Sequence, residues 1–265
     1  MRAAARKTRR WAVRSIGLVI ALTILIPAID IAAAAVVSAL DRPSYRFIAS
    51  AHSSGPIRVV AAGDSLASGY RASAPRKAFV AQIEARLERA RPGSKIWNVS
   101  KPGAHVRDLG HQLDRIACDC NVVLLIAGGN DVRGLTDPLT LLEQERALLD
   151  SVHRKYPGAA VAVANIPDVS VRKFRLRPSQ RRVSLPVSLS WLFGMLVETD
   201  NLFITAMAKH RGATILDLYA ASTLPEAGRR DYISSDGLHP NDAGQARLAA
   251  YVWPSIAQVA GLHVH

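Results

Sequence analysis

The sequence predicts an α/β fold in which a parallel sheet of about five strands is covered by helices on both faces. This prediction rests on the regular alternation, after residue 56, of short apolar runs with longer stretches of helical pattern. Such alternation is typical of parallel strands joined by crossover helices. The composition agrees with a globular domain, because 49% of the residues are hydrophobic and 21% are charged.

Five short apolar runs are expected to form the strands of this sheet, and four longer stretches its main helices. The expected strands are residues 57–62, 95–99, 122–127, 159–164 and 214–218. The expected helices are residues 79–91, 138–156, 196–211 and 242–259. Because ligands of parallel sheets bind beyond the carboxyl ends of the strands, the residues after each strand are the first candidates for a site.

Residues 1–40 have the pattern of an export segment. Six basic residues lie within the first 14 positions, and the apolar stretch Ile16 to Ile29 and a tract of small residues follow. Pro27 and Asp30 interrupt a stretch otherwise long enough to span a bilayer, so a cleaved signal peptide and a membrane anchor are both open. Either one predicts an extracytoplasmic protein, secreted or membrane-anchored, with a linker at residues 41–56 and one domain at residues 57–265.

The formal net charge of +13 is concentrated in two places, the N-terminal stretch and residues 172–182. No zinc-finger spacing and no aromatic RNA-binding signature accompany it, so nucleic acid is not expected as a partner. Two explanations of the clustering stay open. One is contact with an anionic membrane or cell envelope, and the other is a solvated basic loop. The second cluster belongs to residues 169–194, an irregular stretch expected to form either a lid at the binding rim or a surface excursion packed on the core.

Cys118 and Cys120 are the only cysteines. Residues i and i+2 of an extended segment lie about 6.6 Å apart, near the outer limit for a disulfide. A bridge would therefore need a bend, and buried thiols are expected instead. No metal site is predicted, because neither a His-Glu-x-x-His motif nor a second cysteine pair is present.

A serine, a histidine and an aspartate are placed for nucleophilic catalysis. Ser65 follows the first expected strand, and Asp236 and His239 lie three residues apart just before the last expected helix. A serine hydroxyl becomes a nucleophile when a base accepts its proton, and a carboxylate fixes the tautomer of that base. We therefore expect Ser65 to be the nucleophile, His239 the base and Asp236 its acid partner.

An attack on an acyl carbon also needs donors aimed at the oxyanion that develops. The candidates are the backbone N–H of Ser65, the N–H of Gly103 after the second strand, and the side-chain amide of Asn130 after the third. Glycine permits close approach of the backbone, and an amide at position 130 avoids the repulsion that a carboxylate would cause.

Other polar residues near these motifs are expected to have structural roles. Asp64 is interpreted as a local hydrogen-bonding residue rather than a second catalytic acid. His105 and His111 are interpreted as surface or helix-face histidines, and Asp168 as a structural residue at the rim of the sheet.

Four sequence blocks resemble the SGNH subgroup of the GDSL hydrolase family, and from the first block to the last they span about 180 residues. The blocks are Gly63-Asp64-Ser65-Leu66 with Gly69, Asn98-Val99-Ser100-Lys101-Pro102-Gly103, Gly128-Gly129-Asn130-Asp131, and Asp236-Gly237-Leu238-His239-Pro240. The resemblance implies a flavodoxin-like three-layer α/β/α fold and no metal or organic cofactor. It also implies a triad of Ser65, Asp236 and His239, and an oxyanion hole of Ser65, Gly103 and Asn130.

The expected function is that of an exported serine esterase that cleaves carboxylic O-acyl esters of a lipid or an acylated glycan through an acyl-serine intermediate. Ser65 does not lie in a Gly-x-Ser-x-Gly motif, which disfavours the α/β-hydrolase family. Two alternatives stay open. One is an acyltransferase that moves an acyl group onto an envelope sugar or lipid, and the other is a non-catalytic envelope-binding protein that keeps the fold.

Overall fold

The computed structural model describes one body of the chain in detail. The described residues are 15–17, 21, 55–168, 173–175, 182–184, 187–223, 231–234, 236 and 238–262. The predicted export segment and linker, and most of the predicted lid at residues 169–194, lie outside them. Within the described ranges, no helix combines the length and the apolar character needed to cross a membrane.

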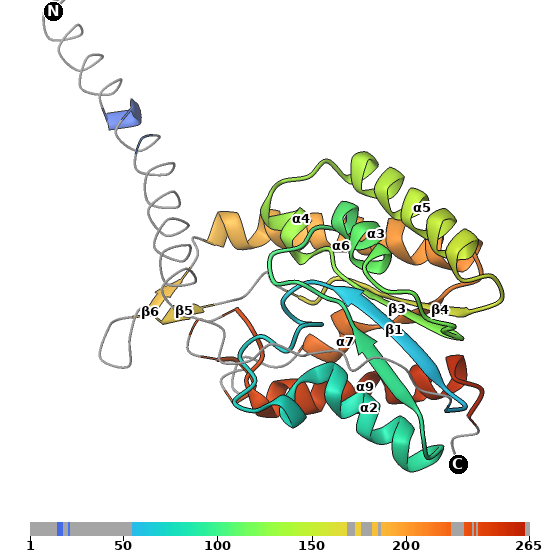
Figure 1. Cartoon of the computed structure of the whole chain (residues 1–265). Helices are drawn as coiled ribbons and strands as arrows, with labels where there is room; N and C mark the ends of the chain where they lie inside the picture. The colour runs from blue at the N-terminus through green and yellow to red at the C-terminus, as the bar shows by residue number, and fades with distance from the viewer. Residues whose placement is uncertain are drawn as a thin grey trace, which may run out of the picture.

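The centre of the fold is a sheet of five parallel strands in the order β2-β1-β3-β4-β7 (Figure 1). The strands are β1 (Arg58–Gly63), β2 (Lys95–Asn98), β3 (Val122–Ile126), β4 (Ala160–Ala164) and β7 (Thr214–Leu216). All five residues of β3 are buried, as expected for the apolar central strand of a sheet that is covered on both faces. The predicted five-stranded parallel sheet is confirmed.

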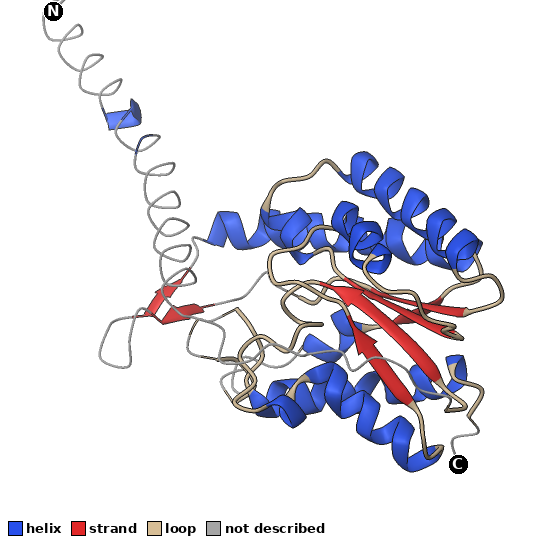
Figure 2. Cartoon of the chain, viewed as in Figure 1, coloured by secondary structure: helices blue, strands red, loops and turns tan. Residues whose placement is uncertain are grey.

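Helices cover both faces of the sheet, which confirms the predicted three-layer α/β/α fold (Figures 1 and 2). One layer contains α2 (Phe79–Ala90), α7 (Leu218–Ser222) and α9 (Asp242–Val259). The other contains α3 (Leu109–Asp114), α4 (Gly129–Arg133), α5 (Pro138–Lys155) and α6 (Val187–His210). Smaller elements are the 3-10 turns η1 (Pro75–Lys77) and η2 (Val106–Asp108), and an antiparallel pair of β5 (Lys173–Arg175) and β6 (Arg182–Ser184).

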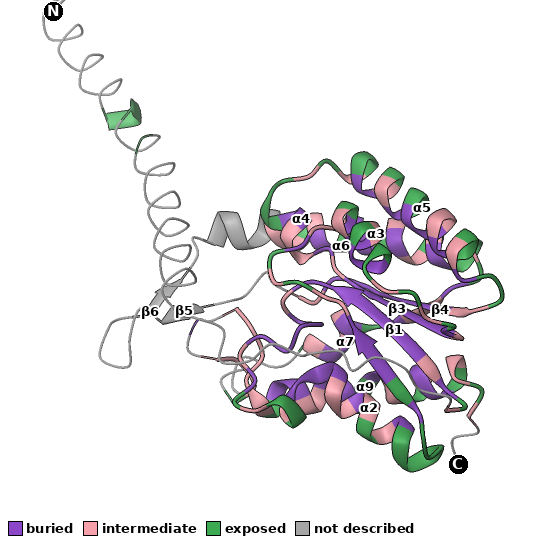
Figure 3. Cartoon of the chain, viewed as in Figure 1, coloured by how far each residue is buried: buried purple, intermediate pink, exposed green. Residues whose placement is uncertain are grey.

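Two hydrophobic clusters lie on the two sides of the sheet. In β1, Val59 and Ala61 pack with the α2 and α9 side, whereas Val60 and Ala62 pack with the α3 and α5 side. This division follows from the period of two along a strand, which points successive side chains to opposite faces. Figure 3 shows the resulting pattern, in which burial on the helices is concentrated where they meet the sheet.

The start of α6 corrects one prediction. The helix was expected over residues 196–211, after an irregular stretch that extended to Gly194, but it begins at Val187. Residues 187–197 include three leucines and a methionine, which favour helix, and contain no proline. Gly194 weakens a helix without ending it, so the irregular interpretation of residues 187–194 is wrong.

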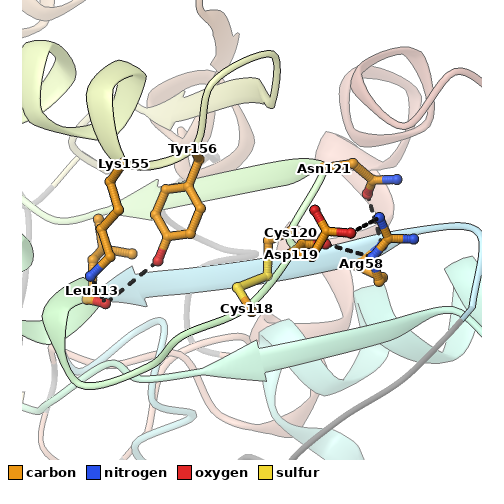
Figure 4. Close-up of a disulfide and its surroundings, with 8 residues drawn as sticks. All are labelled: Arg58, Leu113, Cys118, Asp119, Cys120, Asn121, Lys155 and Tyr156. Carbon is orange, nitrogen blue, oxygen red and sulfur yellow. Dashed lines mark hydrogen bonds and ion pairs between the residues drawn. A yellow bond between two sulfur atoms is a disulfide. The ribbon is translucent and has the colours of Figure 1, made fainter.

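Cys118 and Cys120 form a disulfide, so the prediction of buried thiols is also wrong (Figure 4). The two Cα atoms lie 5.2 Å apart, closer than in an extended segment, because the chain bends before it enters β3. The adjoining residues hold this turn: Arg58 pairs with Asp119 at 3.0 Å, and the Arg58 N–H donates to the Asn121 side chain at 2.8 Å.

Two buried carboxyl groups lie in the helices of the α5 and α6 layer. Burial, with repulsion from Asp131, raises the pKa of Glu145 in α5 to about 8. Burial, with repulsion from Asp131 and Asp137, raises the pKa of Asp200 in α6 to about 6. Both groups therefore favour the protonated form in the folded chain far above the pH at which they ionise in the unfolded chain.

Replacement of Glu145 should change how stability depends on pH. Between about pH 4.3 and pH 8, folded Glu145 keeps a proton that the unfolded chain has lost, so the free energy of unfolding falls as pH rises. We expect Glu145→Gln to remove this fall and to raise the Tm by roughly 5 °C at pH 8, with a smaller effect at pH 5. Thermal unfolding followed by circular dichroism measures the change. The exposed Glu143→Gln on the same helix is the control, and equal shifts in both variants would contradict the assignment.

Candidate active site

The segment after β1 holds Ser65 at the carboxyl edge of the sheet. Gly63 ends β1 where the strands approach so closely that an added Cβ would lie 2.3 Å from the Ile126 carbonyl oxygen. The buried Gln112 accepts from the Gly63 N–H at 2.8 Å and donates to the Gly63 carbonyl at 2.9 Å. The Tyr70 N–H then donates to the Ser65 carbonyl at 2.9 Å, which folds the chain back after the serine.

The loop before α9 carries Asp236 and His239 to the same edge. The Ser234 N–H donates to the His239 carbonyl at 2.8 Å, and the Asn241 N–H donates to the Tyr232 carbonyl at 3.0 Å. Asn241 also caps α9 by accepting from the Gly244 N–H. At Gly244 an added Cβ would lie 2.1 Å from the Tyr232 carbonyl oxygen, so only glycine permits this close packing of the loop on the helix.

Ser65, His239 and Asp236 form a continuous chain of hydrogen bonds. The distance from Ser65 Oγ to His239 Nε2 is 2.9 Å, and that from His239 Nδ1 to Asp236 Oδ2 is 2.8 Å. Burial favours the neutral form of Asp236, but the hydrogen bonds from His239 and Ser234 outweigh it and hold the pKa of this carboxyl well below its usual range. An ionised Asp236 places the proton of neutral His239 on Nδ1 and leaves Nε2 free to accept from the serine.

Gly103 follows β2 and Asn130 follows β3, so both lie at the same edge of the sheet as Ser65. The Asn130 Nδ2 atom donates to the carbonyl oxygen of Ala104, the residue after Gly103, at 2.9 Å. An amide nitrogen carries two hydrogens, so this bond orients the group and leaves a second donor for a ligand. Gly103 has φ +82°, a left-handed conformation that favours glycine.

The residues after β2 are also fixed to the loop of the serine. The Asn98 side chain donates to the Ala67 carbonyl at 2.6 Å and accepts from the Ser100 N–H at 3.1 Å. The sheet thus brings all five sequence-predicted site residues to one edge, with hydrogen bonds between their loops.

The other polar residues named from the sequence have the following contacts and positions in the structure. Asp64 accepts from the Leu66 N–H at 2.9 Å, and burial raises its pKa to about 7. His105 Nδ1 contacts the fully buried Asp131 at 3.1 Å, which joins the segment of Gly103 to α4, whereas His111 is an exposed residue of α3. The Asp168 N–H donates to Ser222 Oγ at 2.7 Å.

Tyr70 and Arg71 contact the triad, although the sequence analysis did not single them out. The Tyr70 and His239 ring centroids lie 4.5 Å apart, and Arg71 Nε donates to Asp236 Oδ2 at 2.9 Å. The only signal in the sequence is their position directly after Gly69, the last residue of the first matched block. In the described part of the chain, no group of three His, Cys, Asp or Glu side chains is placed to hold a metal ion.

The three-layer α/β/α fold has a serine, a histidine and an aspartate joined by hydrogen bonds at the carboxyl edge of its sheet. This combination defines a class of hydrolase-like proteins. Residues 61–247 match the GDSL-like Lipase/Acylhydrolase family. Because the match covers more than half of the sequence, the chain belongs to this family of acyl hydrolases. Comparison with curated proteins gives no significant match.

Solved structures with the same fold come from enzymes of related kinds. The psychrotrophic esterase EstA from Pseudoalteromonas sp. superposes with a TM-score of 0.58 at 17% identity, over 76% of this chain and 97% of that one. An acetylxylan esterase from Geobacillus stearothermophilus gives 0.56 at 17% identity, over 80% and 97%. An extracellular lipase from Streptomyces rimosus gives 0.55 at 20% identity, over 75% and 99%.

Proposed function

We propose that this chain is a serine esterase in which Ser65 forms an acyl intermediate. The observation that carries the proposal is the chain of hydrogen bonds from Ser65 through His239 to Asp236; Gly103 and Asn130, the proposed donors, follow β2 and β3 at the same edge of the sheet. These groups are the ones that acyl transfer through a serine requires.

In the proposed reaction His239 acts twice as a proton carrier. Nε2 accepts the Ser65 proton as Oγ attacks the ester carbonyl, and the N–H groups of Ser65, Gly103 and Asn130 stabilise the oxyanion. His239 then donates this proton to the departing alcohol. A water molecule attacks the acyl-serine with His239 again as the base, which releases the acid and restores the free serine.

The proposed substrates are carboxylic O-acyl esters, with a lipid or an acylated glycan as the alcohol part. The family match supports an acyl ester. Among the proteins of the same fold, one is named as a lipase and another as an acetylxylan esterase, so both kinds of alcohol are represented.

Replacement of Ser65 tests the mechanism directly. We expect Ser65→Ala to lose labelling by a fluorophosphonate probe and to lower the kcat for a p-nitrophenyl ester by roughly 10⁶-fold, because no acyl-enzyme can form. Ser94→Ala, which removes a buried hydroxyl outside the site, is the control and should keep both signals. Full esterase activity in Ser65→Ala would exclude the proposal.

Replacement of Asn130 tests the oxyanion donor. Asn130→Ala should lower kcat by about 10²- to 10³-fold with little change in KM, because the lost hydrogen bond acts mainly in the transition state. Asn121→Ala removes an amide at the opposite end of the sheet and should change stability rather than kcat. Steady-state kinetics on the same ester separates the two effects, and an unchanged kcat in Asn130→Ala would rule out this role.

The proposed location is outside the cytoplasm, with the N-terminal segment as a signal or an anchor. The basic and apolar pattern of residues 1–40 supports it, as does the disulfide of Cys118 with Cys120, since such bonds persist mainly in oxidising compartments.

Export is tested by fusing alkaline phosphatase, which needs disulfides and is active only after export, behind residue 56. We expect an active reporter in a bacterial host, and loss of this activity when the apolar stretch at residues 16–29 is interrupted by two arginines. A matching fusion to β-galactosidase, which is active in the cytoplasm, is the comparison. An active β-galactosidase fusion together with an inactive alkaline phosphatase fusion would contradict the proposed location.

A further inference from the structure

We propose that Arg71 is a positioning residue for the triad, which fixes the Asp236 carboxylate and through it the ring of His239. The inference rests on the proposed function of this site. It adds a fourth side chain to the Ser65, His239 and Asp236 arrangement, and it assigns to a cation a role that the matched sequence blocks do not contain.

The carboxylate of Asp236 is held at both of its oxygen atoms. Oδ1 accepts from Ser234 Oγ at 2.7 Å and from the N–H groups of Leu238 and His239 at 2.8 and 2.9 Å. Oδ2 receives His239 Nδ1 at 2.8 Å and Arg71 Nε at 2.9 Å. Arg71 and His239 thus bind the same oxygen of Asp236. This oxygen fixes the tautomer and the ring orientation of His239.

The ion pair between Arg71 and Asp236 is shielded from water. The two side chains are only 12% and 5% exposed, so the hydrogen bond is charge-assisted in a region of low dielectric, where it is strong and directional. The nearby pair of Lys77 and Asp242 has side chains that are 44% and 33% exposed. An ion pair with side chains this accessible to water contributes less, so the Lys77 and Asp242 pair is the matched comparison.

Arg71 also connects two loops that are far apart in the sequence. It belongs to the loop that carries Ser65, and Asp236 lies 165 positions further along. In the same loop, the ring of Tyr70 contacts the ring of His239, and the Arg71 guanidinium lies 5.2 Å from the centroid of the Tyr70 ring. Adjacent residues therefore contact both the acid and the base of the triad, and they fix these groups relative to the nucleophile.

The backbone of Arg71 is unusual for its residue type. Its φ of +72° lies in the left-handed region, which costs an ordinary side chain about 1 kcal/mol and which glycine adopts freely. Strained conformations of this kind persist where the surroundings enforce them, and they cluster at functional sites. A long cationic side chain at a position that suits glycine is explained by its bond to Asp236.

The charge of Arg71 should also be visible in the pH profile. Asp236, Ser65 and Tyr70 contact His239, and Arg71 binds the Asp236 oxygen that His239 Nδ1 also contacts. Asp64 precedes the serine, and the pair of Lys77 and Asp242 lies at the start of α9. Without the guanidinium charge, the negative charge of Asp236 is less compensated. This favours protonation of His239, the proposed base. The acid limb of the activity profile should therefore move to higher pH.

The test measures the rate at which a fluorophosphonate labels Ser65 in the full chain between pH 5 and 9. For Arg71→Gln we expect a rate about 10- to 100-fold lower, the size of one charge-assisted hydrogen bond, and an acid limb about one pH unit higher. For Arg71→Lys we expect a lower rate with the limb close to that of the wild type, because the charge stays but the fixed Nε donor is lost. Each variant is repeated with Asp64→Asn, because burial raises the pKa of Asp64 to about 7, within the pH range of the test.

Two further variants separate positioning from a merely structural role. Arg71→Gly relieves the backbone strain, so we expect the Tm to stay within a few degrees of the wild type while labelling is slowed as in Arg71→Gln. Lys77→Gln removes a cation that is more accessible to water than Arg71, and it should leave the labelling rate and the acid limb unchanged. A limb that moves equally in Lys77→Gln, or labelling losses that follow the Tm without a moved limb, would overturn the inference. If the wild type is labelled and Arg71→Gln has the same labelling rate and the same acid limb, only the inference about Arg71 fails. If the wild type is not labelled, the proposed function fails as well.

Discussion

The hydrogen bond between Ser65 Oγ and His239 Nε2 is the contact on which the arrangement of the site depends. It joins residues 174 positions apart at 2.9 Å, so β1 and the loop before α9 must meet at one edge of the sheet. β1 lies between β2 and β3, and Gly63 at its end packs directly on the Ile126 carbonyl. The packing of Gly244 on the Tyr232 carbonyl fixes the other partner in the same way. Two glycines that tolerate no side chain thus set the position of both reacting groups.

The proposed oxyanion donors, Gly103 and Asn130, depend on a second set of contacts, and the buried carboxylate in this set lowers the stability of the fold. The bonds of Asn130 to Ala104 and of Asp131 to His105 join the segments after β2 and β3. Asp131 is fully buried, and its charge adds to the burial that raises the pKa of Asp64, Glu145 and Asp200. Carboxyl groups whose pKa is raised by burial oppose folding at neutral pH, so these three groups lower the free energy of unfolding there.

The sequence was informative where a local pattern determines structure. β3 is predicted within one residue because a run of five buried apolar residues has few other solutions. Ser65 and His239 could be proposed because their chemistry and their place before or after a regular element are visible in the sequence. The disulfide of Cys118 with Cys120 depends on a bend that no residue pattern encodes. Arg71 was missed for a similar reason, since its partner is 165 positions away and its φ of +72° is unusual for arginine.

The distribution of charge explains why a cation belongs beside Asp236. An ionised aspartate and an arginine have no net charge together, so the buried pair has a smaller desolvation cost than a lone buried carboxylate would have. In the proposed attack, negative charge develops near Gly103 and Asn130 and positive charge develops on His239. In the proposed reaction Asp236 stabilises the imidazolium through Nδ1, and the hydrogen bond from Arg71 orients that carboxylate. The two charges that form in the reaction are therefore met by groups fixed before the substrate arrives, as electrostatic preorganisation requires.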